Sequence, residues 1–330
     1  MKTPILRAAA AAFAAVLLAA PASADKVRIG YAPSIWDPSD FHGMMGSGVE
    51  SALKAAGVDY EFLIRAPSRE VAHSEQLGIV EDFIAEGVNF IIINPTDPQV
   101  QRVAYEKVVA AGIPLIVGNN STPFPDDWGF QPTMFSGYSH KDAGVVLANY
   151  LHDKYGAGTT VAVIHGIPGQ VTQDRAPREL YDQLGLKVVY EDHADYDRLK
   201  AYDKMERILV SNPDVQVIVA TSSAMAVGAV EASIANGAGG EYPIYGAGGT
   251  LEELKYIEGG LLAGAWIRDP VAMGEAIGNM IAARVADPAA AVEPVFNSPI
   301  YLIDSVEAIN AHVNPVIFTS KGEAWPRPAN

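Results

Sequence analysis

The sequence predicts an α/β protein of two lobes, each built around a parallel β-sheet. Short apolar runs alternate with amphipathic segments along most of the chain, and the connections between them are short. Gly, Pro and Asn punctuate this alternation where turns are needed, as in "NPTDP", "AAGIP" and "SNPDV". Such alternation is typical of βαβ units, which produce parallel sheets. A chain of 330 residues also exceeds one comfortable core, which favours two domains.

The individual elements follow from the length and period of each segment. Runs of about four to six mainly apolar residues bounded by turn residues predict strands. The expected strands are Val27–Ala32, Asp59–Ile64, Phe90–Asn94, Leu115–Gly118, Val161–His165, Lys187–Glu191, Val215–Ala220, Ile244–Gly246 and Ala263–Ile267. Longer amphipathic segments predict helices near Gly43–Ala56, Glu70–Glu86, Val100–Ala111, Ala143–Lys154, Asp174–Leu184, Leu199–Leu209, Met225–Ala235 and Val271–Val285.

A coarse duplication divides the chain. Strand–helix units run to about Gly118, the stretch "NNSTPFPDDWGFQPTMFSG" follows, and a second series then begins. We interpret this Pro- and Gly-rich stretch as the passage from one lobe to the other. Two joined α/β lobes place a cleft between the carboxyl ends of their sheets, where open α/β folds bind ligands.

The first 24 residues have the pattern of a secretory signal peptide. Lys2 and Arg7 form a basic start, Ala8 to Ala20 an apolar stretch, and Ala22-Ser23-Ala24 a small-x-small cleavage site. We expect cleavage after Ala24 and a periplasmic mature protein, with no later apolar run long enough to span a membrane. There are no cysteines, so stability must come from burial rather than from disulfides.

The net charge of −16 argues against two classes of partner. Nucleic acids and anionic membranes both reward clustered Lys and Arg, which an acidic chain does not offer. The simplest interpretation of the charge is solubility.

No catalytic, cofactor or metal motif is found in the sequence. The seven histidines form no H-x-x-x-H pair, and no G-x-S-x-G nucleophile elbow follows a strand. The run "YGAGGTLEEL" (245–254) follows a strand and opens a helix, but it lacks the Walker lysine and reads as a tight turn. Acidic clusters such as Asp126-Asp127 lack the spacing of a calcium loop. We therefore expect a protein that is not an enzyme, with no bound metal.

Three long stretches carry a family resemblance. "FIIINPTDPQV", "ADYDRLKAYDKMERILVSNPDVQVIVATSSAMAVGAVEA" and "IYGAGGTLEELKYIEGGLLAGAWIRDPVAMG" resemble the ribose-type, type I periplasmic sugar-binding proteins of ABC transporters. The likeness covers nearly the whole mature chain. It implies two Rossmann-like lobes joined by three hinge crossings, here near Gln131–Ser139, near Arg268 and near Asn297–Pro299.

The resemblance also implies domain boundaries and a mechanism. Residues 25–136 plus 269–297 would form the N-terminal lobe, and residues 137–268 plus 298–330 the C-terminal lobe. The lobes would close over a small ligand without chemistry, and the closed protein, a monomer, would dock on an inner-membrane ABC permease.

Two charged residues match ligand-binding positions of the family. Asp97 corresponds to an aspartate that accepts hydrogen bonds from ligand hydroxyls, for which a carboxylate has four lone-pair sites. It could also cap the helix near Val100, and both roles can coexist. Arg175 corresponds to an arginine that reaches the ligand, although it could equally be a solvated charge at the start of a helix.

Aromatic and neighbouring polar residues complete the predicted site. Phe41 and Tyr196 match positions that sandwich a sugar ring, whose C–H faces pack on flat apolar surfaces. Trp36 lies nearby in "SIWDPSDF" and could join or replace them, and each of these aromatics could instead have an ordinary core or surface role. We also include His140 and Ser222 among the expected ligand-binding residues.

The chain departs from the family pattern in the second lobe. Ser222-Ser223 stand where the family has an amide or acid, Ala247-Gly248 where it has an aromatic and an aspartate, and Arg268 where it usually has a hinge glutamine. Acceptors are thus lost and a cation is gained. We hypothesise that Arg175 and Arg268 face a ligand with an anionic group or an unusual hydroxyl pattern. The alternative is an ion pair of Arg268 with Asp269 or Asp97.

A second function keeps the fold but changes the output. The tail "NSPIYLIDSVEAINAHVNPVIF" is similar to the ending of the periplasmic receptor for trimethylamine N-oxide, which reports to a membrane histidine kinase. A sensor of this kind would bind a small non-sugar ligand and contact a kinase instead of a permease.

Overall fold

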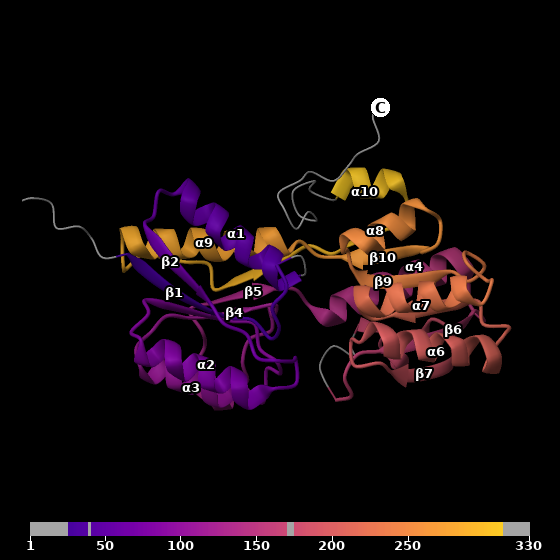
Figure 1. Ribbon diagram of the computed structural model, residues 1–330, viewed down its shortest axis with the longest axis horizontal. Coiled ribbons are helices and arrows are strands. Elements are labelled where there is room, and N and C mark those ends of the chain that lie inside the picture. The colour runs from indigo at the N-terminus through magenta and orange to yellow at the C-terminus, as the bar shows by residue number, and fades with distance from the viewer. Residues whose placement is uncertain (1–25, 39–40, 170–174, 313–330) are drawn as a thin grey trace, which may run out of the picture.

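The computed structural model describes residues 26–38, 41–169 and 175–312, and its strands form two six-stranded sheets (Figure 1). The first sheet has the order β11-β5-β4-β3-β1-β2 and the second β12-β10-β9-β8-β6-β7. The strands of the first sheet are β1 (Val27–Ala32), β2 (Tyr60–Ile64), β3 (Phe90–Ile93), β4 (Leu115–Gly118), β5 (Met134–Gly137) and β11 (Val295–Asn297). Those of the second are β6 (Thr160–His165), β7 (Lys187–His193), β8 (Val217–Ala220), β9 (Ile244–Gly248), β10 (Gly264–Ile267) and β12 (Tyr301–Ile303).

Helices connect most consecutive strands. The first lobe contains α1 (Phe41–Ala55), α2 (His73–Ala85), α3 (Arg102–Ala110), the short 3₁₀ helix η1 (Asp126–Trp128) and α9 (Pro270–Ala286). The second contains α4 (His140–Tyr155), α5 (Arg178–Gln183), α6 (Arg198–Ser211), α7 (Ser223–Ala235), α8 (Leu251–Glu258) and α10 (Val306–His312). None of the helices in the described ranges combines the length and hydropathy that a bilayer crossing requires.

Both sheets are parallel except at one edge. Every strand pair of the first sheet is parallel, and in the second only β12 runs antiparallel, against β10. The predicted two-lobed α/β fold is therefore confirmed, with an antiparallel edge strand that the sequence pattern did not indicate. Parallel strands require crossover connections, which the helices supply.

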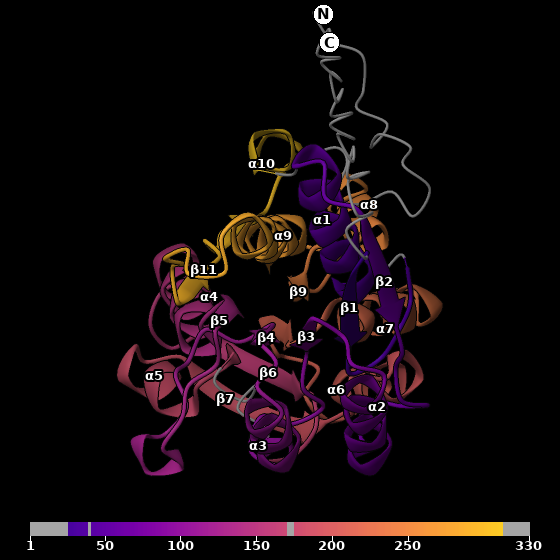
Figure 2. The same ribbon diagram turned by 90° about the vertical axis from the view of Figure 1, so that its left-hand side faces the viewer.

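The first sheet lies between two pairs of helices. Figure 2 shows α1 and α9 over one face and α2 and α3 over the other. Strand β3 shows how its sequence serves both faces, since Phe90 and Ile92 pack in the cluster with α1 and α9, while Ile91 and Ile93 pack in the cluster with α2 and α3. A strand buried on both sides needs a continuous apolar run rather than an alternating one.

The second sheet is covered in the same way. Helices α6, α7, α8 and α10 pack on one face, where Ala162, Ile164 and Ile218 point. Helices α4 and α5 cover the other through Leu147 and Tyr181, among others. Each lobe is thus a three-layer α/β/α unit.

Within the described ranges, the chain passes between the sheets three times, as expected. The passages lie between β5 and α4, between β10 and α9, and between β11 and β12. The stretch from Asn119 to Gly137 was predicted to pass between the lobes, and this is wrong for its last residues, which form β5 and pair with β4 and β11 inside the first sheet. The strands β5, β11 and β12 were not predicted, because β5 contains only two large apolar residues and β11 and β12 are only three residues long.

Candidate ligand-binding cavity

A cavity of about 1120 Å³ lies between the two lobes. Its walls come from segments that follow the carboxyl ends of strands: Ser34 after β1, Thr96 after β3, Asn119 and Asn120 after β4, His140 after β5, Tyr196 after β7, Ser222 after β8, Gly248 at the end of β9 and Arg268 after β10. This is the location at which open α/β sheets bind ligands. The volume slightly exceeds the usual range of small-molecule sites, about 300–1,000 Å³.

The wall of the first lobe rests on a buried polar network. Asn94, fully buried at the end of β3, donates its amide Nδ2 to the Tyr31 hydroxyl at 2.8 Å and faces Nδ1 of His42 at 2.8 Å. The other ring nitrogen of His42 lies 3.0 Å from the Ser34 hydroxyl. His42 and Ser34 both line the cavity, so Asn94 positions His42 directly and Ser34 through His42.

The wall of the second lobe is dominated by Arg175, which is 6% exposed. Its guanidinium donates to Nδ1 of His140 at 3.2 Å, to the carbonyl oxygen of Thr221 at 2.9 Å and to the hydroxyl of Tyr138. All three acceptors are neutral. An arginine has five N–H donors, so this arrangement holds the group in place and leaves donors for a further partner.

Arg268 lies beside Arg175 against the same aromatic rings. Its guanidinium carbon is 4.2 Å from the ring centre of Phe41, 4.7 Å from that of Tyr138 and 5.5 Å from that of Trp266. The corresponding carbon of Arg175 lies 5.8 Å from Tyr138 and 5.6 Å from Trp266. Stacking on aromatic faces stabilises buried guanidinium groups.

His140 lies in direct contact with Arg175 and is neutral. Burial, together with the positive charges of Arg175 and Arg268, holds the pKa of His140 well below its usual range. Because Nδ1 accepts from Arg175, the ring proton of the neutral form is on Nε2. His140 therefore adds a donor to this wall without adding charge.

A buried carboxyl group supports the loops of the second lobe. Glu253, fully buried on α8, accepts hydrogen bonds from the Ser223 hydroxyl at 2.7 Å and from the backbone N–H of Gly249 at 2.6 Å. Burial raises the pKa of Glu253. Ser223 and the neighbouring Gly248 line the cavity, so this carboxyl group fixes the "GAGGT" turn. The turn is tight, with positive φ at Gly248 and Gly249, as the sequence predicts.

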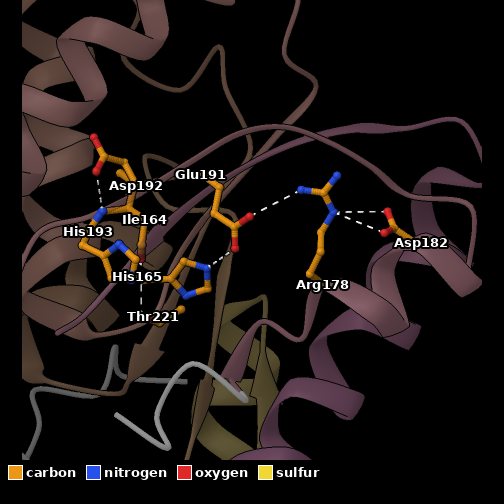
Figure 3. A network of polar contacts seen from close by, with 8 residues as sticks. All are labelled: Ile164, His165, Arg178, Asp182, Glu191, Asp192, His193 and Thr221. Carbon is orange, nitrogen blue, oxygen red and sulfur yellow. Dashed lines mark hydrogen bonds and ion pairs between the residues drawn. The ribbon is translucent and has the colours of Figure 1, made fainter. Parts of the chain in front are cut away.

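A second polar network fixes the chain on both sides of Arg175 (Figure 3). Glu191 on β7 accepts a hydrogen bond from Nε2 of His165 at 2.7 Å and lies 3.4 Å from Nη1 of Arg178. His165 ends β6 and Arg178 begins α5, and Arg175 lies between them in the sequence. One carboxylate thus anchors both flanks of the segment that carries the buried arginine.

Six of the eight predicted ligand-binding residues line the cavity. These are Phe41, His140, Arg175, Tyr196, Ser222 and Arg268. Trp36 does not line it and packs edge-on against Tyr31 at 6.2 Å. Ser222 also caps α7 by accepting from the backbone N–H of Met225. The ligand roles of all eight remain predictions.

Asp97 is also absent from the cavity lining. Its carboxylate accepts from the backbone N–H groups of Gln99 at 2.8 Å and Val100 at 2.9 Å, which caps the turn leading into α3. Of the two roles weighed for Asp97, the structure displays the capping role. Asp269 similarly caps α9 through the N–H of Ala272 at 2.9 Å. No ion pair joins Arg268 to either carboxylate within the described residues.

Several polar residues of the cavity were not predicted from the sequence, chiefly His42, Asn119 and Asn120. A signal for the two asparagines was present, because they directly follow the strand Leu115–Gly118 at its carboxyl end. His42 had no comparable signal. In the described ranges, no three His, Asp or Glu side chains are grouped so as to hold a metal ion.

The fold and the cavity together define the class. Two α/β lobes, three crossings between them and a ligand-sized cavity at the carboxyl ends of both sheets are the features of a type I periplasmic binding protein. A family model described as "Periplasmic binding protein domain" matches residues 29–288, and the chain belongs to this family.

Individual relatives agree with this assignment. The chain is 33% identical over 205 residues to the ribose import binding protein of Bacillus subtilis, a match that covers 61% of this chain and 65%, just under two thirds, of that protein. A solute binding protein from Actinobacillus succinogenes, solved with bound D-allose, superposes with a TM-score of 0.77 at 23% identity, covering 86% and 100% of the two chains. One from Bacillus halodurans with bound myo-inositol gives 0.74 at 24%, covering 88% and 99%. The resemblance to ribose-type sugar-binding proteins is thereby confirmed.

Proposed function

We propose that the protein is a periplasmic receptor that captures a small polar solute, a sugar, polyol or sugar derivative, and delivers it to an ABC permease. The observation that carries the proposal is the cavity between the lobes, lined from both sides by polar and aromatic side chains. Relatives named for ribose import, and structures solved with D-allose and myo-inositol, support this class of ligand.

Closure of the lobes would drive capture. A ligand that first contacts one lobe favours the closed form, because the other lobe adds contacts only when the cavity closes. The ring-stacking and hydrogen-bonding groups of Phe41, Tyr196 and the two asparagines suit a solute with apolar C–H faces and a polar rim. No bond would be made or broken, and the protein would act as a monomer.

Ligand screening tests the proposal directly. A bound solute at 100 times its Kd stabilises the folded state by about 2.7 kcal/mol, so the melting temperature should rise by several degrees. Small-angle scattering of the same sample should show a smaller radius of gyration as the lobes close. A panel of pentoses, hexoses, inositols and small amines that changes neither quantity would contradict the proposal.

A matched pair of variants on one helix controls this screen. Ala224 lies in the first turn of α7 and lines the cavity, whereas Ala235, also exposed, ends the same helix. Ala224→Trp should fill the space and abolish the ligand-induced shift, and Ala235→Trp should leave it unchanged. Ligand-dependent stimulation of the permease ATPase would then support transport, and co-purification with a histidine kinase would support sensing instead.

A further inference from the structure

Charge is distributed unevenly over the cavity. The acidic residues of its lining are all exposed or partly exposed, namely Asp37, Glu70, Asp195, Asp197 and Glu252. Several of them have partners at the rim: Glu252 binds Arg198 at 2.9 Å, and Asp195 binds Lys200. The two buried charged residues of the described lining are both cations, Arg175 and Arg268. The buried end of the cavity, which we call its floor and which contains Arg175, Arg268 and His140, is therefore positive. The exposed rim carries these five acidic side chains and three basic ones, Arg69, Arg198 and Lys255.

The hydrogen-bond partners of Arg175 do not compensate its charge. All its hydrogen bonds within the described residues go to neutral acceptors, and no carboxylate is paired with it there. Removing a guanidinium from water costs several kcal/mol unless an anion compensates it. The buried carboxyl group behind this wall, that of Glu253, accepts hydrogen bonds from Ser223 and Gly249. Its electrostatic interaction is with Arg268. A compensating charge for Arg175 would thus come from the ligand.

The hydrogen-bonding character of the floor agrees with its charge. Arginine side chains only donate, and His140 presents an N–H because its other nitrogen is occupied by Arg175. A sugar hydroxyl both donates and accepts, whereas a carboxylate only accepts, so donors on one side match a carboxylate better. Across the cavity, Asn119 and Asn120 offer both donors and acceptors to hydroxyl groups.

We propose that the ligand is an acidic sugar or polyol whose carboxylate binds Arg175 at the floor of the cavity, with Arg268 adding positive charge and the first lobe contacting the hydroxyl groups. This inference rests on the proposed function, since it specifies the class of solute that the receptor captures. It assigns the charge selectivity of the site to the second lobe. Bidentate binding of a carboxylate by a guanidinium is among the strong, charge-assisted interactions.

Titration calorimetry with matched pairs of solutes tests the proposal. The pairs are D-glucuronate with D-glucose and D-galacturonate with D-galactose, so that the members of each pair share a ring and differ in a carboxylate at C6. In at least one pair the acid should bind about 10- to 100-fold more tightly than its neutral partner, as expected of a charged hydrogen bond. Raising the salt from about 50 mM to about 500 mM should weaken acid binding more than neutral binding.

Variants locate the effect. Arg175→Gln should remove most of the preference for the acid, and Arg175→Lys should retain part of it, because lysine keeps the charge but loses the planar fork. Arg102→Gln is the matched control, since Arg102 is an exposed arginine of α3 paired with Glu106. Circular dichroism would check folding, and the wild-type comparison of acid with neutral solute needs no variant.

The outcomes separate this inference from the proposed function. Neutral solutes that bind as tightly as the acids, or an acid preference that survives Arg175→Gln, would overturn the inference and leave the receptor function intact. If no member of any pair binds and no lobe closure is seen in scattering, the receptor function for this class of solute fails, and the inference fails with it.

Discussion

In each lobe, one buried polar side chain supports the wall of the cavity, and the two lobes use different side chains for this. In the first lobe the buried amide of Asn94 holds Tyr31 and His42, and in the second the buried carboxyl of Glu253 holds Ser223 and Gly249. Each of these side chains packs against a glycine, Asn94 against Gly118 on β4 and Glu253 against Gly246 on β9. A Cβ at Gly118 would overlap Oδ1 of Asn94, and a Cβ at Gly246 would overlap Oε1 of Glu253. The geometry is shared, but of the two supporting side chains only the carboxyl of Glu253 can titrate, so the support of the second wall depends on a proton.

The largest expected effect is the loss of stability when the amide of Asn94 is removed. We expect Asn94→Ala to lower the free energy of unfolding by about 2–4 kcal/mol, because the buried Tyr31 and His42 lose a partner and a cavity forms. Urea denaturation measures the change. Asn149→Ala, at an exposed position on α4, is the control and should not lower stability by more than about 0.5 kcal/mol. Equal losses for the two variants would show that the buried network has no special weight.

Substitution of either strand glycine by alanine should lower the free energy of unfolding by a similar amount. Gly118→Ala and Gly246→Ala each force a methyl group against a fully buried side chain, so each should cost about 1–3 kcal/mol in denaturant unfolding. Gly78 on α2 provides the control, because a Cβ there meets nothing within 4 Å, and Gly78→Ala should stabilise by about 0.5–1 kcal/mol. A loss of stability in only one of these two variants would show that the lobes do not share this packing arrangement.

Variants of Asp97 test whether the carboxylate that follows β3 contacts the ligand. Asp97→Ala should cost about 1 kcal/mol, whereas Asp97→Asn should be nearly neutral, since asparagine caps as well as aspartate. Because Asp97 does not line the cavity, the Asn variant should also bind ligand with unchanged affinity by calorimetry. A large loss of affinity in that variant would restore Asp97 as a ligand contact.

The smallest effect should be a change in pH dependence. Burial raises the pKa of Glu253 above its ordinary 4.5, so its contribution to stability is complete below pH 4.5 and is lost as pH rises through the folded-state pKa. Glu253→Gln cannot titrate, so its stability relative to wild type should improve between pH 4.5 and 7. Thermal unfolding in a pH series measures this. The low pKa of His140 affects both proteins equally and cancels, and a difference independent of pH would refute the assignment.

Much of the fold was accessible from sequence because its signals are local. The continuous run Phe90–Ile93 predicts a strand buried on both faces, and four-residue runs such as Leu115–Gly118 were located to the residue. Strand β5 was missed because it contains only two large apolar residues. Strands β11 and β12 were missed because three residues at a sheet edge are specified by their partners rather than by their own pattern.

The site was predictable where family positions or strand ends point to it, as for Arg175 and Arg268. Two kinds of information were missing. Nothing in the sequence shows that the Asp97 carboxylate is occupied by backbone N–H groups, which is a matter of side-chain rotamer. Nor can a sequence show that Asn94 and His42, or Glu253 and Ser223, meet beneath the cavity walls, because those contacts arise from tertiary packing.

The position of α9 delays the completion of the first lobe. Met273, Ile277 and Ile281 of this helix share a core with Met45 and Val49 of α1, although the strands β6 to β10 of the second sheet lie between them in the chain. The first lobe therefore stays incomplete until β11, which ends at Asn297, has emerged, and the second lobe until β12 and α10 have followed. Neither lobe is built from one continuous stretch of chain, so both are completed only near the end of synthesis.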